Sequence, residues 1–478
     1  MFDTIQYILQ RECKIYAMNL VLVGFSGGPD SLCLLDILNK LGYPLIAAHL
    51  NHDLRSEAAT DATLVQLQAE RLGVPFVMGQ VDTKAYAEDH SLSIEEAARI
   101  LRYNFLFHEA DKAGAQAVAV AHNADDQVET VLMHLLRGSG LAGLRGMEYR
   151  TCPTEWNNTI PLVRPLLSTW RSDILNYCAE HELKPVIDQS NYDTTYLRNR
   201  IRHDLLPVLE SYNSRFRHSL LRSSQSLAGD YNLIQSMTSM AWCNCLIKQG
   251  SGYLTFDLAS YQELPPALQR NLLRQAIAYH RPGLRDVDFE HIERGLAFLS
   301  GPKPNTQIDL VAGLRLFLEG DAFWLTTWET DLPISEWPGI KPGEQYTLNI
   351  PGVLILRDKW ELEAEDEPDV DEAWRRVETN QDPFQAWMDA SELELPLIVR
   401  ARRRGDRFQP LGMGGHSTKL SDLMINLKLP NRARNTWPLV CSGGNILWVP
   451  GFRLSHLARL KPSTSQAVHL RIIHSSAT

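Results

Sequence analysis

The chain has 478 residues, 44% of them hydrophobic, so it is too long for one hydrophobic core and has an ordinary globular composition. Its seven cysteines include no CxxC pair, which argues against a disulfide scaffold or a zinc site and predicts a reducing compartment. No apolar run approaches the roughly 18 residues of a membrane span, and no signal-peptide layout opens the chain. We therefore expect a cytoplasmic protein with no membrane partner.

The net charge is −10, but the charges are unevenly distributed along the chain. Arginines gather at residues 198–222 and 400–407, whereas acids gather at residues 361–372. A local basic surface sets the field that a polyanion meets, whatever the net charge. A solvated surface explains either basic cluster alone, but both together favour binding of RNA or DNA.

The sequence first predicts an amphipathic helix over residues 2–18 and a buried strand from residue 21. After a glycine turn, an apolar pattern over residues 32–38 fits a second helix. Between strand and helix, Gly27 and Gly28 let the backbone approach a ligand, and the first helical amides favour an anion, most often phosphate. No lysine follows the glycines, so this is not a Walker loop. Asp30 would repel a phosphate without a cation between them, which indicates Mg²⁺. The alternative is an ordinary turn in which Asp30 and Ser31 cap the first amides.

Strands and helices then alternate up to about residue 136. The predicted strands cover residues 44–50, 74–81 and 116–121, and the predicted helices cover residues 58–72, a stretch from 93, and 124–136. This order is typical of a doubly wound parallel sheet, whose ligands bind beyond the carboxyl ends of the strands. We expect three polar loops at that edge, at residues 26–31, 49–55 and 122–126.

The rest of the chain is predicted as a mainly helical middle domain and a small α+β C-terminal domain. A long helix over residues 214–248 is expected to bridge domains, and the acidic stretch 361–372 to be a linker or exposed loop. The predicted boundaries give these parts: residues 1–213, catalytic; 214–330, helical linker and RNA contact; 331–393, connecting region; 394–478, C-terminal.

Acidic residues open the helix at residues 124–136. Asp125 and Asp126 stand four and three positions before Glu129, so their carboxylates share neighbouring faces of one helix. Like charges at this spacing favour a cation, either Mg²⁺ or the ammonium group of a small substrate. The alternative is that the acids only favour the helix dipole and that His122 only packs.

Two arginines, Arg99 and Arg102, lie three residues apart on the helix that starts near Ser93. Arginine suits phosphate and the charge that develops on a transferring group. Surface ion pairs with Glu95 and Glu96 are the alternative interpretation.

The string from Ser26 to Ser31, SGGPDS, resembles the SGGxDS motif of the PP-loop ATP pyrophosphatase superfamily. A further ordered set of stretches is similar to the tRNA(Ile)-lysidine synthetase family over nearly the whole chain. These stretches are residues 49–55, 95–99 with 102–103, 121–130, 136–141, 164–166, 188–191 with 198–202, 404–407, 419–422 and 430–438. Asn123 departs from the pattern, because a second histidine is common there.

This resemblance implies a two-step reaction. ATP adenylates the C2 oxygen of the wobble cytidine in a CAU anticodon and releases pyrophosphate. The ε-amine of free lysine then attacks C2 and displaces AMP, leaving lysidine. The implied cofactors are ATP and Mg²⁺, and the implied partners are L-lysine and tRNA(Ile) with a CAU anticodon. A homodimer is left open.

The resemblance also implies roles for particular residues. The expected ATP-binding residues are Ser26, Gly27, Gly28, Pro29, Asp30, Ser31 and His49, with Asp30 also holding the metal. The expected catalytic residues are Asp30, Arg99, Arg102, His122, Asp126 and Glu129. Asp126 and Glu129 would bind the lysine amine or act as its base, and which residue does which stays open.

The expected tRNA-binding residues come from both basic segments. They are Arg198, Arg200, Arg202, Arg402, Arg403, Arg404, Arg407, Lys419, Arg432 and Arg434, with Lys428. A PP-loop tRNA thiolase is the alternative, since it would share the ATP site. Thiolases usually need a catalytic cysteine pair, and the scattered cysteines disfavour that reading.

Overall fold

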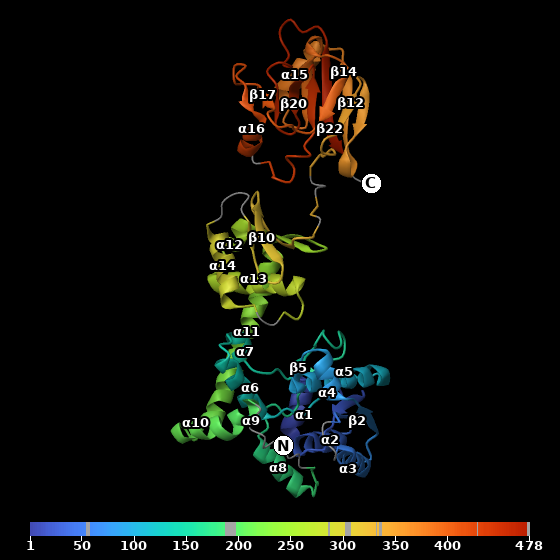
Figure 1. Ribbon diagram of the computed structural model, residues 1–478, viewed down its shortest axis with the longest axis vertical. Helices are drawn as coiled ribbons and strands as arrows, with labels where there is room; N and C mark the ends of the chain where they lie inside the picture. Colours follow the sequence, from blue (N-terminus) through green and yellow to red (C-terminus); the bar gives the residue numbers. More distant parts are fainter. Residues whose placement is uncertain are drawn as a thin grey trace. The chain divides into compact units, whose positions relative to one another are not determined.

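The computed structural model describes residues 1–53, 58–186, 197–284, 287–301, 307–330, 332–333, 337–427 and 429–475. Lys428 and parts of the stretches 49–55 and 188–202 therefore lie outside the described residues. The chain divides into two compact units, Met1–Ser236 and Met237–Thr478 (Figure 1). The division falls inside the long helix α11 (Phe216–Cys245), close to the predicted 214–248.

The first unit alternates strands and helices, as predicted. Its strands are β1 (Val21–Gly24), β2 (Leu45–Asn51), β3 (Phe76–Gln80), β4 (Ala117–Ala119), β5 (Arg150–Thr151) and β6 (Leu162–Val163). Its helices before α11 are α1 (Phe2–Arg11), α2 (Pro29–Lys40), α3 (Ala58–Arg71), α4 (Thr83–Asp89), α5 (Ile94–Ala113), α6 (Ala124–Leu136), α7 (Leu141–Leu144), α8 (Arg171–Glu180), α9 (Leu197–Arg200), a π-helical turn (Ile201–Leu205) and α10 (Leu206–Tyr212). The first helix ends earlier than the predicted 2–18, because the chain turns at Lys14, where φ is 53°.

The sheet of the first unit has the order β3-β2-β1-β4-β6-β5 within the described residues. Strands β1, β2, β3, β4 and β6 run parallel, and β5 pairs antiparallel with β6. The chain leaves β3 at one edge and returns to the sheet as β4 on the other side of β1. In such sheets a ligand crevice forms where neighbouring strands lead in opposite directions, which here is beyond the ends of β1 and β4.

Both faces of this sheet are covered, which confirms the doubly wound fold (Figure 1). Val21 and Val23 of β1 pack on one face with side chains from α1, α2 and α8. Leu22 points to the opposite face and packs with Tyr103 and Leu106 of α5. Because successive side chains of a strand alternate, the wholly apolar β1 is buried on both sides.

The second unit combines antiparallel sheets with helices. Its middle part contains β7 (Leu246–Gly250), β8 (Tyr253–Asp257), α12 (Leu258–Gln262), α13 (Pro266–His280), α14 (Phe289–Ser300), β9 (Gln307–Asp309), β10 (Leu314–Glu319) and β11 (Ala322–Thr327). The described strands of this part form one sheet in the order β7-β8-β11-β10-β9, which adds an antiparallel layer to the predicted helices.

The remainder of the second unit is largely β structure. Its elements are β12 (Gln345–Leu348), β13 (Gly352–Ile355), β14 (Trp360–Glu367), α15 (Val370–Thr379), β15 (Gln385–Asp389), β16 (Leu397–Arg400), β17 (Arg407–Phe408), β18 (Thr418–Lys419), α16 (Leu420–Asn426), β19 (Leu439–Ser442), β20 (Asn445–Val449), β21 (Arg453–Leu454) and β22 (Ala467–His474). Among the described strands, the two larger sheets have the orders β12-β16-β19-β20-β21 and β13-β14-β22-β15.

The prediction of a linker or exposed loop at residues 361–372 is wrong. Strand β14 pairs with both β13 and β22, and Leu362 and Ala364 are buried in the core that these strands share. The acids between them alternate to the other face, because side chains on a strand repeat with a period of two. Strands before the predicted boundary at residue 394 pair with strands after it: β12 pairs with β16, and β14 and β15 pair with β22. The described strands of segment 331–393 are therefore part of the C-terminal sheets rather than a connection.

Candidate active site

The loop between β1 and α2 is bent at Gly27. Its φ is 76°, and a Cβ there would lie 2.7 Å from Val65 Cγ2, so this position requires glycine. Ser31 Oγ accepts a hydrogen bond from the Ser26 amide at 3.2 Å and donates one to the Gly28 carbonyl at 3.1 Å. These bonds fix the loop at the N-terminus of α2, where the helix dipole favours an anion.

Two side chains from distant segments hold the Asp30 carboxylate, in the first turn of α2. Asn123 Nδ2 donates to Oδ1 at 3.0 Å, and Arg171 Nη1 donates to Oδ2 at 3.2 Å. The departure of Asn123 from the family pattern thus has a structural use here. Arg171 is a site residue that the sequence analysis missed, since a single arginine at a helix start carries no local signal.

Asn123 also caps α6. Its Oδ1 accepts from the Asp126 amide at 3.0 Å, while Asp126 Oδ2 accepts from the Asn123 amide at 3.0 Å, which forms a capping box. Asp125 accepts from the Arg171 amide at 2.9 Å and from Arg217 Nη1 at 2.6 Å. The start of α6 therefore connects the α2 loop with α8 and α11.

The cations that pair with Asp126 and Glu129 of α6 are arginines from residues 198–202. Glu129, whose side chain is 1% exposed, accepts from Arg198 Nε at 2.7 Å and from Arg202 Nε at 2.6 Å. Arg198 Nη2 also lies 3.0 Å from Asp126 Oδ1. Arg202 lies in the π-helical turn Ile201–Leu205, a rare geometry that is frequent at functional sites, and Arg198 lies in α9 directly before it. Arg200 is exposed.

Burial controls the protonation of two groups near α6. It raises the pKa of Asp126 above its ordinary value, and the nearby charge of Glu129 adds to this effect while Arg198 opposes it. It also lowers the pKa of His122 far below its ordinary value, with help from the positive charges of Arg164 and Arg198. His122 Nδ1 is buried without a hydrogen-bond partner among the described residues. Its imidazole is therefore neutral at pH 7.

The predicted residues Arg99, Arg102 and His49 lie in the same unit. The guanidinium carbons of Arg99 and Arg102 lie 5.0 and 5.7 Å from the centroid of the Tyr103 ring, and their charges also act on His122. His49 Nδ1 lies 2.9 Å from the carbonyl oxygen of Phe25, immediately before the loop. The structure thus brings the predicted ATP-binding and catalytic residues of the first unit to one edge of the sheet.

In the second unit, a buried ion pair supports the basic segment that follows β16. Arg400 binds both oxygens of Asp406, at 2.8 and 2.9 Å, and holds the turn between them. Burial tends to raise the pKa of Asp406, but the hydrogen bonds from Arg400 and from the Arg403 amide, together with the charges of both arginines, lower it below its ordinary value. The predicted tRNA-binding residues on and beside this turn have exposed or half-buried side chains: Arg402, Arg403, Arg404, Arg407 and Lys419.

The structure does not place Arg432 and Arg434 with these exposed cations. Arg432 pairs with Glu319, with Nε–Oε distances of 2.9 and 3.1 Å, and lies over the Trp324 ring. Arg434 is buried, and its Nε donates to the Leu429 carbonyl at 2.9 Å. Both guanidinium groups bind partners within the protein, so their placement does not support the predicted role in binding tRNA.

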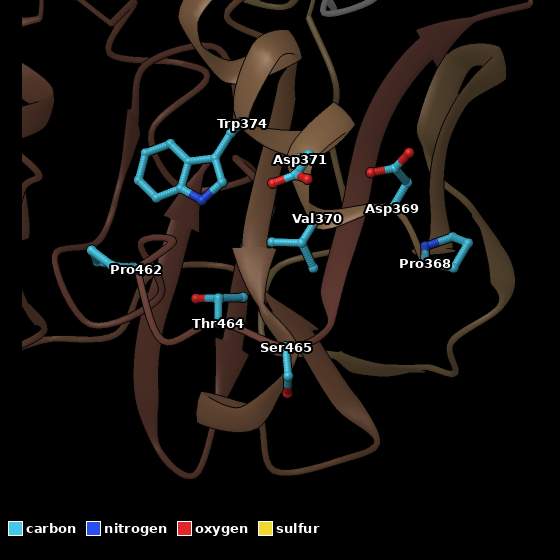
Figure 2. Close-up of a pocket in the computed structure, with 8 residues that line it drawn as sticks. All are labelled: Pro368, Asp369, Val370, Asp371, Trp374, Pro462, Thr464 and Ser465. Carbon is cyan, nitrogen blue, oxygen red and sulfur yellow. The ribbon is translucent and has the colours of Figure 1, made fainter.

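A cavity of about 580 Å³ opens between the start of α15 and residues 462–465 (Figure 2). Figure 2 shows the carboxylates of Asp369 and Asp371 at its wall, with Trp374 beside them. Carboxylates repel phosphate, and none of the predicted site residues lines this cavity. It is therefore unsuited to the nucleotide or to an RNA backbone.

The donor set beside the loop fits Mg²⁺ carried by a nucleotide. Mg²⁺ is usually bound through one or two carboxylates together with substrate phosphates and water. Asp30 supplies one such carboxylate next to the anion site, and the described residues contain no group of three metal-ligating side chains that could hold an ion by themselves. Within the part of the chain that the structure describes, no helix is long and apolar enough to cross a membrane.

Comparison with known families divides the chain into three matches. The family described as "PP-loop domain" matches residues 3–209, "TilS substrate binding domain" matches residues 256–318, and "TilS substrate C-terminal domain" matches residues 397–471. The matches follow one another along the chain in the order of the structural parts described above.

Several curated proteins are similar over nearly their whole length. The tRNA(Ile)-lysidine synthase of Dehalococcoides mccartyi (strain CBDB1) is 35% identical over 479 residues, covering 98% of each chain. The enzyme of the same name from Clostridioides difficile (strain 630) is 30% identical and covers 98% of each chain. That of Geobacter sulfurreducens is 33% identical and covers 95% of this chain and 93% of its own.

Proposed function

The chain belongs to the tRNA(Ile)-lysidine synthase family, and from this premise we propose that it uses ATP to ligate free lysine to C2 of the wobble cytidine in tRNA(Ile) with a CAU anticodon. The observation that carries the proposal is the hydrogen bond of 3.0 Å between Asn123 and Asp30. It joins the anion cradle of the α2 loop to the acidic start of α6. This bond supports the proposal because it links the proposed ATP site to the proposed amine site.

The proposed reaction has two steps. The C2 oxygen of the cytidine attacks the α-phosphorus of ATP, and pyrophosphate leaves. The neutral ε-amine of lysine then attacks C2, AMP leaves with the oxygen, and the amine nitrogen loses a proton. Adenylation is needed because the oxygen of a poorly electrophilic carbonyl carbon is a poor leaving group.

The loop residues Ser26, Gly27, Gly28, Pro29 and Ser31 would hold the phosphates of ATP. Asp30 would hold Mg²⁺, which supplies positive charge that offsets the charge on pyrophosphate. His49 lies beside the start of this loop through its contact with the Phe25 carbonyl, which suits the proposed contact with the nucleotide.

Asp126 is the better candidate to receive the lysine amine and take its proton. Its side chain is 16% exposed, and burial raises its pKa, which makes it a stronger base than an ordinary carboxylate. Glu129 is almost wholly buried and holds two arginines, so we assign it the role of anchoring Arg198 and Arg202. His122 is the second candidate for the base, because it is neutral and its Nδ1 has no partner among the described residues, but its lowered pKa makes it a weaker base than an ordinary histidine.

Arginines provide positive charge on both sides of the proposed site. Arg99 and Arg102 would stabilise charge during adenylyl transfer. The α6 acids would hold Arg198 and Arg202 in place near the RNA, and exposed Arg200 would contact the RNA backbone. The exposed cations of the second unit would bind the tRNA body electrostatically, so the affinity should fall as salt rises.

A tRNA thiolase is the alternative from the same superfamily. A thiolase would need reactive thiolates, but burial raises the pKa of Cys13 to about 12 and that of Cys178 to about 11. Cys33, on α2, is buried as well, and its thiol pKa is raised further. These thiols are protonated at neutral pH and poor nucleophiles. A sulfur-transfer assay with the same tRNA distinguishes the two enzymes.

The direct test incubates the protein with ATP, radiolabelled lysine and tRNA(Ile) bearing the CAU anticodon, followed by nucleoside analysis. We expect label in the wobble nucleoside and release of AMP and pyrophosphate in equal amounts. D126N should raise the KM for lysine about ten-fold or more while pyrophosphate release continues, because only the second step needs the amine. D111N, an exposed aspartate of α5, is the matched control. Formation of ADP, or no labelled nucleoside, would refute the proposal.

A further inference from the structure

The α2 loop lacks the lysine that a Walker loop would supply, yet a guanidinium group stands beside it. Arg171 opens α8 and places Nη1 3.2 Å from Asp30 Oδ2. Its backbone amide donates to Asp125 Oδ2 at 2.9 Å, which fixes the helix start against α6. The side chain is 35% exposed, so it can change partner while the backbone stays in place.

Charge balance at Asp30 must change when a nucleotide binds. In the structure Asp30 shares its negative charge with Arg171 and takes an amide hydrogen bond from Asn123. When a phosphate occupies the cradle, the divalent cation that it carries would lie next to Asp30 and would neutralise this carboxylate in place of Arg171. The guanidinium would then lose its carboxylate, and the nearest anion would be the phosphate itself.

We propose that Arg171 binds the polyphosphate of ATP. When the nucleotide enters, the guanidinium of Arg171 leaves Asp30 and binds the phosphates instead. The planar guanidinium can hold two phosphate oxygens at once, which makes arginine well suited to this role. Pyrophosphate gains negative charge as it leaves, and a guanidinium placed there stabilises that charge most when it forms. This inference rests on the proposed function, and it names the cation that serves the loop in place of a Walker lysine.

A structural role is the competing explanation, in which Arg171 only fastens α8 to α2. The two explanations differ in what substitution does to different ligands. Loss of a phosphate ligand weakens binding of pyrophosphate and ATP but spares AMP, which lacks the β- and γ-phosphates. Loss of a helix fastening weakens all three ligands together.

The test is calorimetric titration of the full-length protein with pyrophosphate, ATP and AMP, each with Mg²⁺. R171A should weaken pyrophosphate and ATP binding about ten-fold or more, the effect expected for one lost charge-assisted contact, and change AMP binding less than about two-fold. R171K should be intermediate, because lysine keeps the charge but not the paired donors. R11A, an exposed arginine on α1, is the matched control.

Equal weakening of all three ligands in R171A and R171K, or unchanged binding of pyrophosphate, would overturn the inference. R171K keeps the test decisive if R171A does not fold. Lysine transfer by the wild-type protein is measured in parallel. If it occurs while R171A binds pyrophosphate normally, the role of Arg171 fails and the proposed function stands; if the wild-type protein binds no ATP, both fail.

Discussion

Replacement of Glu129 by glutamine tests the ion-pair network that organises the site. The carboxylate is 1% exposed and receives hydrogen bonds from Arg198 Nε, Arg202 Nε and Arg202 Nη2 at 2.7, 2.6 and 3.1 Å. E129Q keeps the size and one acceptor of the side chain but removes its charge. Two guanidinium groups then face an uncharged amide, and one oxygen position becomes a donor.

The magnitude follows from the burial of the three groups. Removing one partner of a buried ion pair costs about 3–5 kcal/mol. Arg198 and Arg202 are 32% and 21% exposed, so water compensates part of the loss, and we expect a decrease of about 2–4 kcal/mol in the free energy of local unfolding. The matched control is E148Q, because Glu148 is 40% exposed and pairs with Arg145. Such a pair contributes about 0–1 kcal/mol.

Hydrogen exchange of the α6 and α10 amides measures this effect within the full chain, where a single unfolding midpoint would mix the two units. Protection of these amides should fall in E129Q and stay nearly unchanged in E148Q. Equal protection in both variants would show that Glu129 is not the anchor of Arg198 and Arg202, and the assignment of separate roles to Asp126 and Glu129 would be lost.

Two further predictions concern the loop and a half-buried histidine. G27A should weaken ATP binding about ten-fold or more in a calorimetric titration, because the 2.7 Å approach to Val65 and the φ of 76° force the cradle to shift. G42A carries the same backbone strain, with a φ of 78°, but its Cβ would meet open space beyond the other end of α2, so it should leave ATP binding intact. Burial lowers the pKa of His52 to about 4, helped by the charge of Arg102, so between pH 6.5 and 4 the unfolded chain binds a proton that the folded chain does not. As the pH falls through that window, the stability of the first unit should fall by less than about 3 kcal/mol, because His52 is partly exposed, and hydrogen exchange of the β2 amides should show a smaller fall in H52Q; an identical pH dependence in both proteins would contradict this assignment.

The elements that could be predicted are those set by local chemistry. The helix predicted at residues 124–136 is α6, and the strand, glycine turn and helix around residue 27 are β1, the loop and α2. A helix cap, a glycine bend and a regular repeat of apolar residues each depend on residues that are close together in the sequence. A short segment is therefore enough to predict each of them. The sequence predicts a linker or exposed loop where strand β14 lies, because only Leu362 and Ala364 form the buried side of this strand and its many acidic side chains favour exposure to solvent.

The kind of site follows from the residue pattern: a bend that only glycine allows, an anion cradle without a lysine, and acids one helical turn apart. Which cations pair with those acids depends on how the chain folds. Glu129 is paired by Arg198 and Arg202, which are 69 and 73 residues away along the chain, and Asp30 by Arg171, 141 residues away. Coulomb energy depends on distance in space, and chain folding, not sequence separation, sets that distance.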